Sequence, residues 1–227
     1  MPEGPEVWIV SQALNKLTNN PNYSETFGKH LFITEPIGIR EITFGLTGKL
    51  KVEKSNENKI LLEKMNVGFC FGDDRIISEN LYITIINESL GLNFMKIDKE
   101  TFNFIGSKWS SSKKKLGALL LDQKEISGIG VAWGSEILHK ACLDPDVKAC
   151  DQNLSTLANA LYEIQQYCIQ VYTEYLQSII QTDKINNNSD LLVDFINKWY
   201  KNLYIVREMN AYKKGEQIKT GGRIWYK

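Results

Sequence analysis

The chain has few of the residues from which metal sites and disulfide frameworks are built. Its 227 residues include four cysteines and two histidines, and no two cysteines are spaced as Cys-x-x-Cys. This excludes a recognisable zinc-ligand pattern, and a chain of this length can bury a core without disulfide bonds. We therefore expect reduced cysteines, no bound metal and no cofactor. The chain also lacks a run of about 18 apolar residues, which excludes a transmembrane helix.

An excess of charge of one sign is lacking too. Lysine plus arginine and aspartate plus glutamate each number 27, so the formal net charge is zero, whereas nucleic-acid-binding domains often have a pI above about 9. The average conceals a basic C-terminal end, because residues 198–227 contain eight lysines and arginines but only two acidic residues. Lys108 and residues 113–115 form a second basic cluster. Such clusters can attract phosphate, or they can be a solvated surface.

The composition that remains is that of an ordinary globular protein, 43% hydrophobic and 24% charged. The N-terminus carries Glu3 and Glu6 and no basic flank, so it is not a secretion signal. We expect an intracellular protein, in the cytoplasm, nucleoid or nucleus depending on its host.

The spacing of apolar residues predicts a helix followed by strands. Val7, Val10 and Leu14 recur at helical spacing, which predicts a helix over residues 5–18. From about residue 29 to 95, short β-rich runs separated by Gly, Asn and Asp indicate an antiparallel β domain. These runs are 30–34, 38–44, 59–63, 68–71 and 82–86. Residues 96–112 are expected to be a connector.

The second half of the chain is predicted to be mainly helical. The expected helices are 115–123, 131–141, 155–180 and 190–201. At the C-terminus, residues 210–212 and 223–226 flank three glycines and are predicted to pair as a β-hairpin.

The first residues can carry covalent chemistry. Proline at position 2 allows removal of Met1, which leaves Pro2 as a secondary amine at the N-terminus. An α-amine has a pKa of about 7.7–8.0, against about 10.4 for lysine, so a useful fraction is unprotonated and nucleophilic at neutral pH. Such an amine forms an iminium with a sugar aldehyde, and Glu3 beside it can donate and accept protons. The alternative is that these residues are only a solvated terminus.

A second signal lies between two predicted helices. Gly128 and Gly130 follow the segment Leu119–Gln123 and precede the helix that contains Glu136. A tight glycine turn between helices is typical of helix-turn-helix relatives, and backbone amides at the start of a helix bind phosphate. The alternative is a purely structural turn between packed helices.

Together these segments resemble the Fpg/Nei family of DNA glycosylases. The resemblance starts at Pro-Glu-Gly-Pro-Glu (residues 2–6) and includes Leu-Leu-Asp-Gln-x4-Gly-Ile-Gly (residues 120–130). Further motifs in the family's order are Gly28–Phe32, Phe44–Gly48, Asp73–Arg75 and Gly222–Arg223. The similarity runs from end to end. It implies an α+β fold with an N-terminal antiparallel β-sandwich and an N-terminal helix (1–104), a helical domain with a helix-two-turn-helix (105–203) and a terminal β-hairpin (204–227).

The resemblance also implies an activity and its residues. Pro2 would attack C1′ of a damaged nucleotide, Glu3 would transfer protons, Glu6 would shape the site and Lys29 would contact a phosphate near the lesion. The strand would then be cut by β- and δ-elimination. The implied partner is damaged DNA, double- or single-stranded, bound by a monomer without a membrane. The implied DNA-binding residues are Leu46, Arg75, Gly128, Gly130 and Arg223.

Departures from the family pattern refine these expectations. No cysteine follows Cys168, which fits the zincless finger of some Nei-like members. Val131 replaces the family's usual phosphate-binding Asn, and Leu46 and Ile77 stand where Met and Phe are usual. In the family, the residues at these two positions insert into the gap that the flipped base leaves. Leu46 and Ile77 would fill that gap less well, which suggests tolerance of single-stranded DNA.

Segment lengths depart from the family as well. The gap between Pro2 and Lys29 is short, so strands of the N-terminal domain are expected to be missing. The short segment 181–189 leaves no room for the loop that caps 8-oxoguanine, which favours oxidised pyrimidines and hydantoins as substrates. Two alternatives stay open: a damaged-DNA-binding module without catalysis, and an enzyme that is mainly an AP-site lyase.

Overall fold

A computed structural model of the chain describes residues 2–44, 49–54, 60–65, 73–186, 190–206, 209–220 and 223–226. The chain divides into two compact units. The first unit comprises Met1–Asn87 and Gln170–Arg207, and the second comprises Glu88–Ile169 and Glu208–Lys227. Strands dominate the first part of the chain and helices the second, which confirms the expected α+β class. The domain limits expected from the sequence remain a prediction.

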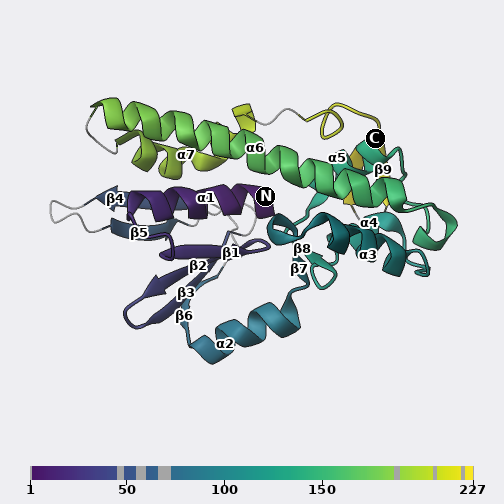
Figure 1. Ribbon diagram of the computed structural model, residues 1–227, viewed down its shortest axis with the longest axis horizontal. Coiled ribbons are helices and arrows are strands. Elements are labelled where there is room, and N and C mark those ends of the chain that lie inside the picture. Colours follow the sequence, from purple (N-terminus) through teal and green to yellow (C-terminus); the bar gives the residue numbers. More distant parts are fainter. Residues whose placement is uncertain are drawn as a thin grey trace. The chain divides into compact units, whose positions relative to one another are not determined.

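An antiparallel sheet is the centre of the first unit (Figure 1). Its described strands are β1 (Ser24–Phe27), β2 (His30–Glu35), β3 (Gly38–Thr43) and β6 (Asp74–Ile77), in the order β1-β2-β3-β6. Side chains alternate between the two faces of a strand, and Leu31, Ile33 and Ile42 are fully buried on one face. A separate antiparallel pair consists of β4 (Lys49–Lys54) and β5 (Ile60–Met65).

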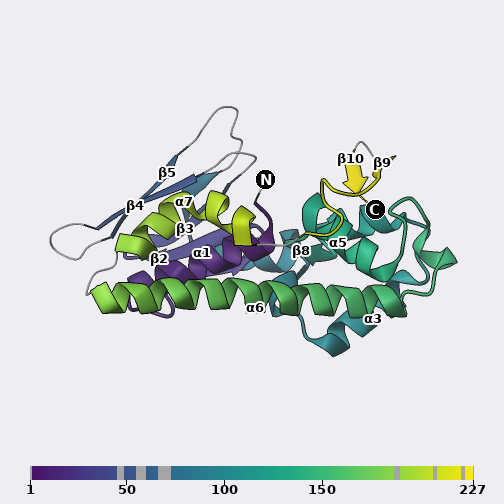
Figure 2. The same cartoon turned by 90° about the horizontal axis from the view of Figure 1, so that it is seen from above.

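Helix α1 (Gly4–Leu17) lies between these strands and the helices α6 (Ser155–Asn186) and α7 (Asp190–Val206) in Figure 1, and Figure 2 shows α1 beside α6 from above. The helix begins with Pro5 in its first turn and a capping box formed by Glu3 and Glu6. Its apolar residues Val7, Val10 and Leu14 are fully buried. The predicted helix over 5–18 is therefore confirmed.

Hydrogen bonds fix the neighbours of α1. Asn15 Nδ2 donates to the Ser24 carbonyl at 2.8 Å, the Ser24 N–H donates to Asn15 Oδ1 at 2.7 Å, and the hydroxyls of Ser11 and Ser24 are 3.0 Å apart. On α7, Asn197 bonds both the N–H and the carbonyl of Val52 in β4. These bonds set the register between the helices and the strands of the first unit.

The second unit contains α3 (Lys99–Trp109), α4 (Leu116–Leu121), α5 (Val131–Ala141) and the first part of α6. Two short strands, β7 (Leu92–Asn93) and β8 (Ile126–Ser127), pair in parallel. The antiparallel hairpin of β9 (Gln217–Thr220) and β10 (Arg223–Tyr226) completes the unit. No helix in the described part of the chain has both the length and the hydropathy that crossing a bilayer requires.

The strand expected over residues 82–86 was wrong because its local pattern was overridden. Residues 82–86, predicted as a strand, lie in α2 (Glu79–Thr84) and the π-helical segment Ile85–Ser89. Ser78 caps α2, and the Tyr82 ring packs edge-on against Phe32 at 4.9 Å. These contacts outweigh the β preference of the Ile-Thr-Ile-Ile run.

The predicted connector 96–112 contains α3. Asp98 caps α3 by accepting the Thr101 N–H at 2.7 Å, and Phe102, Ile105 and Trp109 bury its apolar stripe. An N-cap residue followed by an apolar stripe could have been recognised in the sequence.

The C-terminal hairpin is present, but its first strand was misplaced. β10 pairs with Gln217–Thr220 and not with residues 210–212. The backbone N–H groups of Asn210, Ala211 and Tyr212 all donate to the buried carboxylate of Glu136, at 2.7–2.8 Å. A segment whose amides are used in this way has none left for a strand ladder.

Candidate functional site

The predicted nucleophile lies at the buried start of α1. Pro2 is buried, and the side chains of Glu3 and Glu6 are only 3% and 1% exposed. The N–H of Glu3 donates to Glu6 Oε2 at 3.0 Å, and the hydroxyl of Tyr172 on α6 donates to Glu6 Oε1 at 3.2 Å. The Glu6 carboxylate therefore links the residue next to Pro2 to a second helix of the same unit.

Lys29 lies in a tight turn of the antiparallel sheet. Gly28 and Lys29 connect β1 to β2, and Gly28 has a φ of +59°, as a type II′ turn requires at its first central residue. β1 begins at Ser24, whose hydroxyl lies 3.0 Å from that of Ser11 on α1. Lys29 itself is partly exposed.

A buried carboxylate holds Arg75, one of the predicted DNA-binding residues, against the sheet. Glu41 on β3 is 2% exposed, its Oε1 lies 2.7 Å from His30 Nδ1, and its Oε2 accepts from Arg75 Nε and Nη2, both at 2.8 Å. Burial alone would raise the pKa of Glu41, but the hydrogen bonds from His30 and Arg75 outweigh it and lower that pKa. Arg75 remains 52% exposed on β6. Leu46 lies outside the described residues.

In the second unit, a rigid turn precedes α5. Gly128 has a φ of +107°, and its N–H donates to Gln123 Oε1 at 2.9 Å, while Gln123 Nε2 donates to the Ile129 carbonyl at 2.9 Å. Gly130 occupies the N-cap position of α5. The first amides of a helix and its dipole favour an anion at this position, so the predicted phosphate-binding turn has a suitable backbone.

The terminal hairpin is anchored by Trp225, which is 1% exposed. A Cβ atom added at Gly117 would lie 2.8 Å from Trp225 Cζ2, and one at Gly134 would lie 2.9 Å from Trp225 Cζ3. The indole thus fills a slot that only glycine on α4 and α5 leaves open. Arg223, two residues earlier on β10, is exposed and lines a cavity of about 230 Å³ with Lys115.

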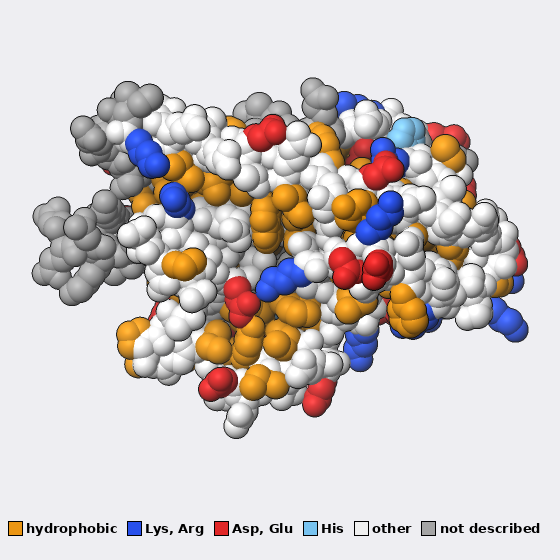
Figure 3. Space-filling view, in the orientation of Figure 1, with side chains coloured by type: hydrophobic (Ala, Val, Ile, Leu, Met, Phe, Trp, Pro, Cys, Tyr) orange, Lys and Arg blue, Asp and Glu red, His pale blue; other side chains and the backbone are white. Residues whose placement is uncertain are grey.

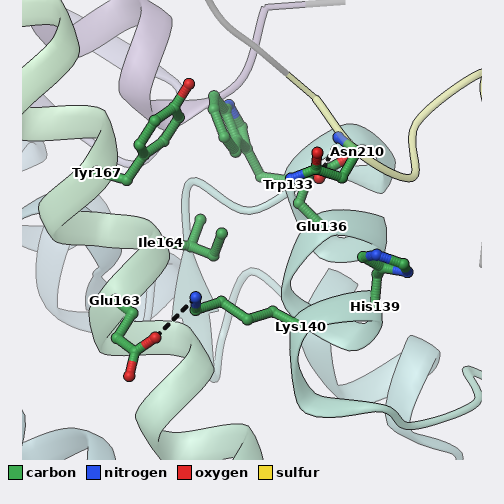
Figure 4. Close-up of a pocket in the computed structure, with 8 residues that line it drawn as sticks. All are labelled: Trp133, Glu136, His139, Lys140, Glu163, Ile164, Tyr167 and Asn210. Carbon is green, nitrogen blue, oxygen red and sulfur yellow. Dashed lines mark hydrogen bonds and ion pairs between the residues drawn. The ribbon is translucent and has the colours of Figure 1, made fainter.

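A larger cavity, of about 470 Å³, lies between α5, α6 and residue 210 (Figure 4). Trp133 and Tyr167 meet edge to face at one end, and the Lys140–Glu163 ion pair, at 2.8 Å, lies at the other. Glu136 enters the cavity wall beside Asn210, where it holds the backbone that leads to the hairpin. Its role here is to fix that backbone.

Sequence comparisons extend over nearly the whole chain. No protein-family model matches it. The chain is 24% identical to a formamidopyrimidine-DNA glycosylase of Enterobacter sp. (strain 638) and 25% identical to that of Escherichia coli (strain 55989 / EAEC). Each match covers 95% of this chain and 80% of the relative. A third relative, from Vesicomyosocius okutanii, is 22% identical over 90% of this chain and 76% of its own length.

Solved structures share the fold. Wild-type Lactococcus lactis Fpg in complex with DNA that contains N7-benzyl-Fapy-dG has a TM-score of 0.70, and the same protein with DNA that contains an abasic site has one of 0.69. Both are 17% identical and cover 99% of this chain and 97% of theirs. The chain is thus similar over nearly its whole length to curated proteins of the Fpg/Nei family, and it shares their fold.

The predicted basic cluster is largely paired with acids. Lys108 bonds Glu125, Lys114 bonds Asp122 and Lys115 bonds Asp146, at 2.7, 3.2 and 2.6 Å. On the face drawn in Figure 3, basic and acidic side chains are interspersed. These pairs neutralise most of the positive charge of the cluster.

No group of three or more metal-ligating side chains occurs among the residues that the structure describes. Of the described cysteines, Cys142 and Cys150 are exposed thiols and Cys168 is buried. Sequence reasoning named Pro2 and Glu3 from their chemistry and Glu6 from the family resemblance. It missed Tyr172 and Glu41, whose partners are distant in the chain.

Proposed function

We propose that this protein is a bifunctional DNA glycosylase and AP lyase of base excision repair. The observation that carries the proposal is the buried Pro2–Glu3 segment, which Glu6 holds at the start of α1. A nucleophile and a proton carrier are then adjacent, as amine catalysis on a flipped nucleotide requires. Lys29 would supply the phosphate contact. The protein would act inside the cell, where genomic DNA is found.

The chemistry starts after Met1 is removed. The Pro2 nitrogen attacks C1′ of the damaged nucleotide, and the base leaves with the electrons of the glycosidic bond. Glu3 protonates O4′ as the sugar ring opens, which leaves an iminium between Pro2 and C1′. Loss of a proton from C2′ expels the 3′ phosphate, and a second elimination expels the 5′ phosphate. Water finally hydrolyses the iminium and releases Pro2.

DNA binding would use both units. Lys29 would contact a phosphate near the lesion, while the amides of the Gly128–Gly130 turn and Arg223 would hold the backbone around it, contacts that position DNA without reading its sequence. Leu46 and Arg75 would support the space left by the flipped nucleotide. No side-chain amide stands at Val131, so the backbone of the turn carries that contact alone.

The favoured substrates are oxidised pyrimidines and hydantoins. Helix α6 ends at Asn186 and α7 begins at Asp190, which supports the absence of a long loop over the lesion between them. The relatives are named for formamidopyrimidine, and one similar structure is Lactococcus lactis Fpg with DNA containing an oxidised pyrimidine, so both lesion classes belong in the test.

A mainly AP-lyase activity is the second candidate. It is favoured by the contact between Arg75 and Glu41, because an arginine held on the sheet is a poor wedge for opening a duplex. An abasic site in single-stranded DNA needs neither a wedge nor cleavage of a glycosidic bond.

Borohydride trapping tests the proposal. The protein, with its N-terminus verified as Pro2 by mass spectrometry, is mixed with oligonucleotides that carry an abasic site, thymine glycol, a hydantoin or a formamidopyrimidine, single- and double-stranded. We expect covalent adducts with wild type and none with protein whose N-terminal amine has been chemically blocked, a loss of at least about 100-fold with Glu3→Gln, and no change with the exposed-residue control Glu79→Gln. Adducts with the abasic site alone would identify a lyase. DNA binding without any adduct would overturn the enzyme proposal in favour of a binding module.

A further inference from the structure

A hydrogen-bonded path connects the middle of α6 to the residue beside the nucleophile. The Tyr172 hydroxyl donates to Glu6 Oε1, and Glu6 Oε2 accepts the N–H of Glu3. Tyr172 is 0% exposed and Glu6 is 1% exposed, so water does not replace these bonds. All three residues belong to the first unit.

We propose that Tyr172 is a positioning residue for the reaction: its phenol fixes the Glu6 carboxylate, which in turn fixes the backbone at Glu3 and thereby Pro2. This inference rests on the proposed function, since it concerns the same nucleophile. Tyr172 touches no reacting atom and acts through Glu6.

The physical argument starts from the cost of a buried carboxylate. An ionised oxygen out of water needs hydrogen-bond donors, and losing one costs more than the bond itself contributed. Without the phenol, the Glu6 carboxylate can rotate toward another donor. Such a rotation moves the oxygen that holds the Glu3 N–H, and a displacement of about 1 Å at a reacting group can cost about 100-fold in rate.

The ring and the hydroxyl of Tyr172 have different roles, and a substitution can distinguish them. Cys168, Tyr172 and Leu176 follow at helical spacing and are all buried, so the ring belongs to the apolar face and the hydroxyl is its polar end. Tyr172→Phe removes only that hydroxyl. Tyr175, on the same helix and in the same unit, packs edge-on against Phe195 at 5.8 Å. Tyr175→Phe is therefore a matched control.

The experiment measures chemistry and binding separately on the full chain. Single-turnover strand cleavage and borohydride trapping on abasic-site DNA give the rate, and fluorescence anisotropy with uncleavable tetrahydrofuran DNA gives the Kd. We expect Tyr172→Phe to lower the single-turnover rate about 10- to 100-fold, with the Kd within about twofold of wild type. Tyr175→Phe should retain the wild-type rate and Kd. Circular dichroism verifies that each variant is folded.

A double-mutant cycle identifies the path. Once Glu6→Gln has removed the carboxylate, adding Tyr172→Phe should lower the rate little further, because the phenol then has no charged partner to fix. Additive losses would show that the phenol acts by another route, and so would a loss that appears only in the Kd. A wild-type rate for Tyr172→Phe would overturn the inference and leave the proposed function standing. A wild-type protein that forms no adduct would overturn both.

Discussion

Buried carboxylates of the two units differ in the donors that distant elements supply. In the first unit, Glu6 and Glu41 bond side chains from other elements, Tyr172 in one case and His30 and Arg75 in the other. In the second unit, Glu136 bonds three consecutive backbone N–H groups of a distant segment. A side-chain donor can orient a carboxylate beside a reacting group, whereas three backbone donors fix the course of the chain. We therefore expect changes at Tyr172 and Glu6 to alter rates, and changes at the hairpin of the second unit to alter stability and binding.

The largest effect is expected at the hairpin of the second unit. Trp225→Ala empties the slot between Gly117 and Gly134, which should lower the free energy of unfolding by about 3–5 kcal/mol. Thermal unfolding and the rate of proteolysis at the hairpin measure this. Ile224→Ala, on the same strand but 42% exposed, should change little. If Trp225→Ala abolished cleavage without loosening the hairpin, the assignment of the second unit to stability and binding would fail.

The next effect concerns the ion pairs of the first unit. Because the folded pKa of Glu41 is below its ordinary value of 4.5, its ionised form stabilises the fold above that pH, and this stabilisation is lost as the pH falls through the folded pKa. Glu41→Gln should cost about 1–3 kcal/mol at pH 7 and flatten the acid limb of the stability curve. Urea titrations between pH 7 and pH 3 measure both.

The exposed Lys51–Glu53 pair provides a control for Glu41. Its side chains are 46% and 57% exposed, so Glu53→Gln should cost less than about 1 kcal/mol. Equal costs for the two substitutions would mean that burial at Glu41 does not strengthen its bonds.

These examples show what the sequence could reveal. The helix over 131–141 was predicted with its observed bounds because its apolar stripe starts after Gly130 and its signals are local. Pro2 and Glu3 were named from the chemistry of an N-terminal amine beside a carboxylate, and Glu6 from the family resemblance of residues 2–6. Tyr172 could not be named, since it lies 166 residues from Glu6 and its pattern is that of an ordinary core residue. Contacts between distant residues depend on packing, which a single sequence does not display.

The same reasoning explains the errors. The run at residues 82–86 has the composition of a strand, and only the contact of Tyr82 with Phe32 and its hydrogen bond to Glu25 show why it is helical. Burial and the Glu25 carboxylate raise the pKa of the Tyr82 hydroxyl. The hairpin partner was misplaced because Glu136, 74 residues before Asn210, uses the amides of that segment.

A smaller effect is expected at the helical hairpin of the first unit. Asp183, near the end of α6 and 5% exposed, accepts the N–H groups of Leu191 and Leu192 at 3.1 and 2.9 Å. It therefore caps α7, and Asp183→Ala should cost about 1 kcal/mol. Glu174→Ala, at an exposed position of α6, is the control for helix effects in thermal unfolding. Since α7 holds β4 through Asn197, a larger loss would show that the cap also supports the strands.

The smallest effect concerns attraction of DNA by the second unit. Lys115 shares a cavity with Arg223 but is paired with Asp146 at 2.6 Å, both side chains being about half exposed. Asp146→Asn should free Lys115 for a phosphate. Since an exposed pair is worth at most about 1 kcal/mol, affinity should rise only about two- to threefold, with the salt dependence steeper by about one phosphate contact. Anisotropy titrations between 50 and 200 mM salt, roughly the range over which phosphate contacts weaken, measure both quantities. Glu163→Gln frees Lys140 from a similar exposed pair, so an equal gain there would mean that net charge, and not the position of Lys115 beside Arg223, sets the affinity.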